Sequence, residues 1–217
     1  MGRNSKETIK KLQVVSFHSR SGGVGKSTEA LRLAKRLSAQ GKRVCVIDLD
    51  VIGAGLMPLL ANNAMKKYLR QNTVAFLEQY LLATDTNDFD IGKLIIPCQA
   101  FGVILQLRGI DLERIQINIW RDHRSDEKSL TKLAKILDDN VDMLFRNELH
   151  FKEIAIRLNI LFKKLIEKGF DSVILDCHTG VKFVAESLIE MATKKRYDWK
   201  LVWISPKPPQ NTRRNVV

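Results

Sequence analysis

Apolar and polar positions along this chain predict strands and helices that follow one another in a regular order. The runs Lys11–Phe17, Arg43–Leu49 and Ser172–Asp176 are short and almost continuously apolar, which is typical of strands buried on both faces of a parallel sheet. Between Ser27 and Gln40 the apolar residues recur at helical spacing, and Gly41 is a suitable helix stop. The first part of the chain is therefore expected to form a right-handed strand–helix–strand unit.

The same patterns predict further elements in the rest of the chain. Phe101–Leu107 and Ile115–Trp120 fit either a strand or a buried helix, because periodicity does not separate the two in short apolar runs. The clearer segments are helices over Asn63–Ala83, Asp126–Leu137, Phe151–Lys168 and Lys182–Thr193, and strands over Leu94–Pro97 and Lys200–Ser205. We expect an α/β fold with a mostly parallel sheet flanked by helices. Residues 1–10 are expected to be a flexible tail and residues 11–217 one domain, with a largely helical insertion at about 62–150 and an apparently short C-terminus.

Composition narrows the class of protein without deciding its function. The chain has 217 residues, of which 45% are hydrophobic and 28% charged, as in ordinary globular proteins. No run is long and apolar enough for a membrane span, and the N-terminus lacks a signal-peptide core. A cytoplasmic location is therefore expected. Cys45, Cys98 and Cys177 are far apart in apolar runs, which indicates reduced core thiols and neither a disulfide framework nor a zinc site.

Charge is the unusual part of the composition. The formal net charge is +12 and the isoelectric point about 9.7, so the molecule attracts nucleic acid, anionic lipid or an acidic partner. The excess is spread along the chain in small basic clusters, and no recognisable nucleic-acid motif accompanies it. Binding of DNA or RNA is therefore expected to be non-specific, and a well-solvated basic surface is the alternative.

A glycine-rich segment between the first strand and the first helix carries the clearest chemistry. It reads Ser21-Gly22-Gly23-Val24-Gly25-Lys26-Ser27-Thr28. Glycines at a strand–helix junction leave backbone N–H groups free to bind phosphate oxygens, which the helix N-terminus also favours. In such a loop the lysine reaches the β- and γ-phosphates and the serine hydroxyl binds Mg²⁺. The first glycine of the usual spacing is replaced by Arg20.

Carboxylates follow two of the expected strands. Asp48 and Asp50 end the second strand, and Asp176 ends the third, at the sheet edge where parallel sheets bind ligands. One of the first pair is expected to hold Mg²⁺ through water and the other to orient the attacking water, with Asp176 acting on Mg²⁺. The alternative for the first pair is a loop or helix-capping role. His178 follows the third strand and fits either a contact to phosphate or water, or a structural hydrogen bond.

These segments together resemble the deviant Walker A ATPases of the ParA/MinD type. Their loop usually reads KGGVGKTT, and a branch of the family carries a phrase like F-x-S-x-KGGVGR-[ST], then DLDLEAPGL and VLIDxRTG. This chain matches these phrases in order at residues 17–28, 48–56 and 173–180, and Leu94-Ile95-Ile96-Pro97 is similar to the family's strand before a helical insertion. Residues 62–93 and 98–150 are matched only loosely.

The resemblance implies a P-loop fold that binds ATP and Mg²⁺, often as a dimer across the nucleotide. It assigns the phosphates to residues 20–28 (Arg20, Ser21, Gly22, Gly23, Val24, Gly25, Lys26, Ser27 and Thr28) and the adenine to a loop with Pro206 and Pro208. It makes Lys26 and Asp50 the catalytic residues and Ser27, Asp48 and Asp176 the Mg²⁺ ligands.

Two departures from the family pattern concern dimer-dependent hydrolysis. Ser21 stands where the family has the lysine that reaches the partner's ATP, with Arg20 beside it, and Ile52 replaces a common glutamate. Arginine and lysine at shifted positions are not equivalent. Beyond the proline loop the family continues with more helices and strands, so either the chain is truncated or a partner supplies that layer.

The function expected from the sequence is that of a slow ATPase. Its nucleotide state would switch association with a protein partner, in DNA partition, positioning or an antiphage assembly. The alternative is a non-hydrolysing, nucleotide-bound scaffold that binds nucleic acid or a protein partner. A bacterial tyrosine kinase shares the loop type, but this chain has only Tyr68, Tyr80 and Tyr197 and no tyrosine-rich tail.

Overall fold

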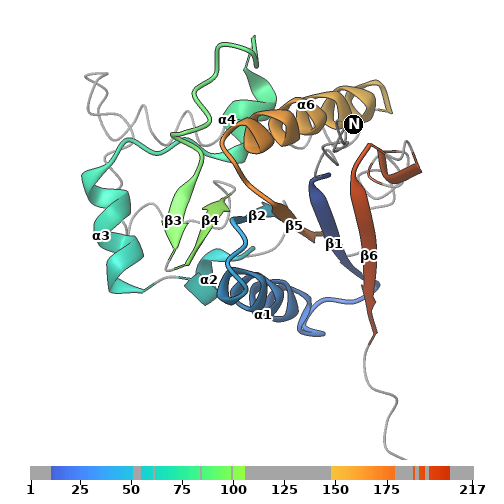
Figure 1. Ribbon diagram of the computed structural model, residues 1–217, viewed down its shortest axis with the longest axis horizontal. Coiled ribbons are helices and arrows are strands. Elements are labelled where there is room, and N and C mark those ends of the chain that lie inside the picture. The colour runs from blue at the N-terminus through green and yellow to red at the C-terminus, as the bar shows by residue number, and fades with distance from the viewer. Residues whose placement is uncertain are drawn as a thin grey trace, which may run out of the picture.

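The computed structural model of the chain contains a six-stranded sheet between two groups of helices (Figure 1). It describes residues 11–50, 55–60, 62–83, 85–98, 100–105, 148–178, 188, 191–193 and 196–205. The strands are β1 (Gln13–Ser19), β2 (Val44–Leu49), β3 (Ile96–Cys98), β4 (Phe101–Ile104), β5 (Ser172–Cys177) and β6 (Asp198–Ile204). The helices are α1 (Lys26–Ala39), α2 (Met57–Leu60), α3 (Asn63–Gln71), α4 (Leu77–Leu82) and α6 (Glu148–Glu167).

The sheet is mostly parallel, as its buried strands predict. Its order is β3-β4-β2-β5-β1-β6, and only the pair β3–β4 is antiparallel. Side chains alternate between its faces: Val15 and Phe17 of β1 join one core cluster and Val14 the other. Because both faces are covered, each central strand is apolar along nearly its whole length.

Each face of the sheet has its own helical layer. The first core cluster lies under α1, α2 and α3 and includes Ala30, Leu60 and Leu69. The second lies under α4 and α6 and includes Tyr80 and Phe162. Figure 1 shows α1 and α2 on one side of the sheet and α4 and α6 on the other. This three-layer arrangement confirms the expected α/β class.

The helix expected over Asn63–Ala83 is wrong in extent, because the structure breaks it in two. Asn72, directly after α3, has an extended backbone (φ −123°, ψ 148°). The chain then runs to α4 with backbone hydrogen bonds from Ala75 N–H to Lys93 O (2.9 Å) and from Leu77 N–H to Leu105 O (2.9 Å). These long-range hydrogen bonds replace the helical ones. The break was not evident from the sequence, because apolar residues continue through it.

The strand expected over Leu94–Pro97 is shifted, and its proline lies inside it. β3 runs from Ile96 to Cys98, pairs with β4 alone and exposes Pro97. Proline has no N–H to donate and is tolerated in an edge strand.

The segment from Phe101, which fitted either a strand or a buried helix, is strand β4. The expected segments Ile115–Trp120 and Asp126–Leu137, the tail 1–10 and residues 106–147 of the insertion lie outside the described residues.

The three cysteines are buried and free, as the sequence predicts. Cys45 and Cys177 belong to the core on one face of the sheet and Cys98 to the core on the other. Burial raises the pKa of all three thiols, so they stay protonated and unreactive at neutral pH.

Candidate functional site

The candidate site lies at the carboxyl ends of three neighbouring strands, β2, β5 and β1. In the parallel register, Asp48 of β2 is beside Asp176 of β5, which in turn is beside Phe17 of β1. The glycine-rich loop leaves β1 directly after Ser19 and enters α1 at Lys26. Sheet topology therefore brings the loop and both expected acidic positions to one edge, as parallel sheets generally do for ligands.

The loop is shaped by glycine and is open to solvent. Gly23 and Gly25 have positive φ angles of 72° and 91°, a backbone region that favours glycine. Gly25 is also the residue that caps α1, and no side chain caps the helix. The first N–H groups of α1 are thus left available for an anionic ligand. Arg20, Ser21, Gly22 and Gly23 are exposed, and Val24 and Ser27 are half-buried.

Lys26 is the centre of the site. Its side chain is only 5% exposed, and its Nζ donates to Asp176 Oδ1 at 2.5 Å and lies 3.9 Å from Asp50 Oδ2. A buried ammonium requires such counter-charges, because desolvation of an unpaired charge is costly. Lys26 therefore links the loop to both of the strand ends that carry acidic residues.

Asp176 is fully buried and keeps one oxygen without a partner. Burial raises the pKa of this carboxyl, while the charge of Lys26 and hydrogen bonds from Lys26 and Ser27 lower it. Its Oδ2 has no hydrogen-bond partner. An unpaired buried carboxylate oxygen is uncommon and calls for an explanation such as an ion. This unpartnered oxygen, on a carboxylate that also bonds to Ser27, fits a ligand for a small divalent cation.

Asp48 has a different environment from Asp176. Its two oxygens accept hydrogen bonds from the backbone N–H groups of Asp50 (3.0 Å) and Leu56 (2.7 Å). The side chain is 1% exposed, and burial raises its pKa to about 7 although these two hydrogen bonds lower it. Asp48 thereby fixes both ends of the loop that follows β2.

Two histidines complete the site, of which His178 was a candidate from the sequence and His18 was not. His178 Nδ1 lies 2.5 Å from Asp50 Oδ1, so Asp50 is held between His178 and Lys26. His18, at the end of β1, is buried with its Nε2 unpartnered, and burial followed by the charge of Lys26 lowers its pKa. Only its place immediately before the loop could have drawn attention to His18. The alternative roles considered for His178 did not include Asp50 as a partner.

Within the described residues, no three His, Cys, Asp or Glu side chains are grouped to hold a metal by themselves. A cation at Ser27 and Asp176 would therefore depend on further ligands such as phosphate oxygens and water. Pro206 and Pro208, the residues expected near the adenine, lie outside the described residues. None of the described helices is long and apolar enough to cross a membrane.

Known proteins resemble this chain in sequence and in fold. The iron-sulfur cluster carrier protein of Helicobacter pylori is 28% identical over 142 residues, which are 65% of this chain and 33% of the relative. The chain thus spans about a third of the length of the curated relatives it matches first. Among solved structures, apo McdA of Cyanthece has a TM-score of 0.50 at 17% identity, over 90% of this chain and 71% of the other. MinD of Pyrococcus horikoshii, solved with Mg-ADP, has a TM-score of 0.49 at 18% identity, over 88% and 57%.

The likeness to McdA concerns the fold alone, because the identity is low. The sequence match is more informative about ancestry. Residues 9–123, just over half of the chain, match the ParA family model, described as NUBPL iron-transfer P-loop NTPase. They contain β1, the glycine-rich loop, α1 and the two aspartates at the end of β2. The chain therefore belongs to the ParA family of P-loop NTPases.

Proposed function

We propose that this chain binds ATP with Mg²⁺, hydrolyses it slowly and uses the nucleotide state to switch its association with a protein partner. The observation that carries the proposal is the position of Lys26. It is buried at the start of α1 and bonded to Asp176, with Asp50 on its other side. The Lys26 ammonium is therefore placed to exchange its contacts with these two carboxylates for a contact with a phosphate.

Phosphate binding is assigned to the loop and the first turn of α1. Residues 20–23 of the loop are exposed, and the uncapped N–H groups of α1 begin at Lys26. Such backbone groups bind phosphate well. Thr28 is exposed on this turn. The adenine contact of Pro206 and Pro208 remains a prediction.

Mg²⁺ is proposed to bind at Ser27 and Asp176. The unpaired Oδ2 of Asp176 supports this assignment, and when bound the ion would neutralise charge on the phosphates. Asp48 is proposed as the Mg²⁺-side neighbour that acts through water. Its two backbone hydrogen bonds also give it the second task of holding the loop that carries Asp50.

Hydrolysis is proposed to depend on Asp50. This carboxylate is partly exposed and contacts both Lys26 and His178, so it is suited to orient a water molecule toward the γ-phosphate. When Lys26 turns to a phosphate, Asp50 loses its contact with Lys26. The contacts of the loop after β2 would then differ between the nucleotide-bound and the nucleotide-free protein. This difference would give the switch a structural basis.

Assembly in the presence of nucleotide is the test of the switch. Light scattering would compare the mass of the protein with ATP, with ADP and without nucleotide, for the wild type and for Lys26→Ala. Lys35→Ala, an exposed lysine of the same helix, is the matched control. We expect ATP to change the mass of the wild type and of the control alone. An equal response of Lys26→Ala would contradict the proposal, and no response of any protein would favour the scaffold alternative.

Carriage of an iron–sulfur cluster is a second candidate, because the family description names iron transfer and the Helicobacter relative is called an iron-sulfur cluster carrier protein. Clusters are held by cysteine thiolates brought together at one point. Cys45 is beside Val173 and Cys177 beside Leu49 in the register of β2 and β5, which separates them by about 13 Å at ~3.3 Å per residue. Cys98 lies in the core on the opposite face. These positions argue against a cluster held by this chain's own cysteines.

A further inference from the structure

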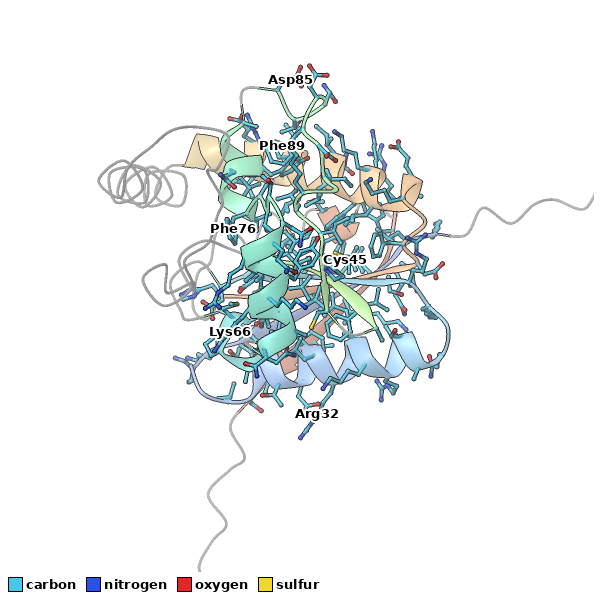
Figure 2. All side chains as sticks on the ribbon, turned by 90° about the vertical axis from the view of Figure 1, so that its left-hand side faces the viewer. Arg32, Cys45, Lys66, Phe76, Asp85 and Phe89 are labelled. Atoms are coloured by element: carbon cyan, nitrogen blue, oxygen red, sulfur yellow. The ribbon has the colours of Figure 1, made fainter. Side chains whose placement is uncertain are left out.

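Strand β6 forms one end of the sheet and lacks the protection that the other end has. β3, at the far end, is three residues long and contains Pro97, and short strands and proline keep an edge from pairing with another chain. Figure 2 looks toward that end, where α3, which carries Lys66, and the segment with Phe76 lie in front of the sheet. β6 is seven residues long, has no proline and, among the described residues, pairs with β1 alone (Figure 1).

The free side of β6 offers its backbone groups at alternate residues. The N–H of Asp198 donates to Leu12 O, directly before β1, at 3.0 Å. The backbone groups of Asp198 and of every second residue after it therefore point toward β1. Those of Leu201 and Trp203 point away from the sheet, where they are available to a further strand.

The same two residues carry exposed apolar side chains. Leu201 is 52% exposed and Trp203 66%. Val202 and Ile204, which alternate with them, pack against the first core cluster. Because side chains alternate between the faces of a strand, Leu201 and Trp203 lie on the other face, with Trp199 and the second core cluster. Exposed apolar side chains on an unpaired strand are typical of an interaction surface.

We propose that β6 pairs in antiparallel fashion with β6 of a second copy of this chain, about a two-fold axis that passes through Val202. In this register Leu201 of each copy lies opposite Trp203 of the other, and the two residues exchange the hydrogen bonds that their outward groups offer. A leucine opposite an aromatic side chain is a favourable cross-strand pair. The two-fold axis produces this pair twice, so one short strand covers its own exposed residues.

Charge favours this register over one centred two residues earlier. Lys200 is exposed, and a register centred on it would place the lysines of the two copies face to face, which is unfavourable. With the axis at Val202, each Lys200 lies opposite Ile204, and the two lysines are about 13 Å apart along the strands at ~3.3 Å per residue. The antiparallel arrangement also points the two glycine-rich loops in opposite directions, because each loop leaves the carboxyl end of β1. This contact is therefore separate from a dimer across the nucleotide.

The mass of the nucleotide-free protein, measured by light scattering over a range of concentrations, tests for the second copy. We expect it to rise from one chain of 24.8 kDa to two. Trp203→Lys should raise the dissociation constant of the dimer at least about tenfold. Ile156→Lys is the control and should behave like the wild type, because it adds the same charge in place of an apolar side chain that is 59% exposed on α6. Lys26→Ala should also dimerise normally, so failure here is distinct from failure of the nucleotide site.

Cysteine cross-linking tests the register. The thiols of Val202→Cys would lie directly opposite each other, in a pair whose Cα atoms are about 4.5 Å apart, which a disulfide can span. We expect this variant to cross-link under mild oxidation. Lys200→Cys, on the same face and more exposed, should not, and the three native cysteines are buried. A wild type that stays monomeric, an equal loss in Ile156→Lys, or equal cross-linking of both cysteine variants would overturn the proposal.

Discussion

At the scale of single residues, the site is a small set of charges that hold one another in place. Lys26 bonds to Asp176 and lies near Asp50, and Asp50 also contacts His178. Asp48 lies beside Asp176 in the sheet and accepts hydrogen bonds from the backbone around it. Each of these residues can be removed separately, and the expected consequences differ.

His178 is expected to be a positioning residue for Asp50. Its imidazole would keep the carboxylate in place when Lys26 turns to a phosphate. His178→Ala should therefore lower the steady-state rate of phosphate release about tenfold while the KM for ATP changes little. His178→Asn, which retains a short polar side chain, should recover part of the rate. A normal rate in His178→Ala, or a change confined to KM, would count against this role.

Asp48 is expected to make stability depend on pH. Its pKa is raised to about 7 in the fold from 3.8, so between about pH 4 and 7 the folded protein holds a proton that the unfolded chain has released. The free energy of unfolding should fall as pH rises through this window. Asp48→Asn removes the group, so the difference in melting temperature, wild type minus variant, should decrease from pH 5 to pH 7 in nucleotide-free protein. A constant or increasing difference would disprove the assignment.

At the scale of elements, the junction between β1 and α1 determines the site. The loop must leave a buried strand, turn through Gly23 and Gly25 and start a helix within a few residues. α1 has no side-chain cap, so its N-terminus depends on backbone shape. The geometry of this junction follows from glycine at particular positions and not from glycine content.

Two glycines of this loop offer a matched pair of substitutions. An added Cβ would have open space at both Gly22 and Gly25, but only Gly25 has a positive φ, of 91°. Gly25→Ala should therefore cost about 1–2 kcal/mol of unfolding free energy from backbone strain, and Gly22→Ala much less. Urea unfolding without nucleotide measures both. Equal stability of the two variants would mean that the loop relaxes freely.

The central elements could be predicted from the sequence because their signals are local. Continuous apolar runs revealed β1, β2 and β5, and helical spacing revealed α1 and α6 to within a few residues. The break between α3 and α4 could not be predicted, because it depends on bonds to Lys93 and Leu105. In the same way, the sequence placed the aspartates at strand ends, but the contact of His178 with Asp50 joins residues 128 positions apart.

At the scale of the whole molecule, the fold places the candidate nucleotide site at a sheet edge and the cysteines in its cores. The three cysteines are enclosed in the cores on both faces of the sheet. The chain thus belongs to a family described by iron transfer, but its three cysteine thiols are not close to one another.

Iron binding is therefore expected to be absent from this chain on its own. After anaerobic incubation with ferrous iron and sulfide and removal of the excess, the protein should retain far less than one iron per chain and show no cluster absorbance. Cys45→Ser, Cys98→Ser and Cys177→Ser should behave like the wild type in this assay. Stoichiometric iron that any of these substitutions removes would contradict the proposed absence of a cluster site.

The most direct test of the account is calorimetric titration of the wild type and of Lys26→Ala with ATP, with and without Mg²⁺. Lys35→Ala is the control on the same helix, and circular dichroism verifies that each protein is folded. We expect the wild type and the control to bind ATP more tightly with Mg²⁺, and Lys26→Ala to lose at least about tenfold in affinity with the loss of one charged hydrogen-bond partner. Unchanged affinity in a folded Lys26→Ala protein would contradict the central claim that this lysine binds the phosphates.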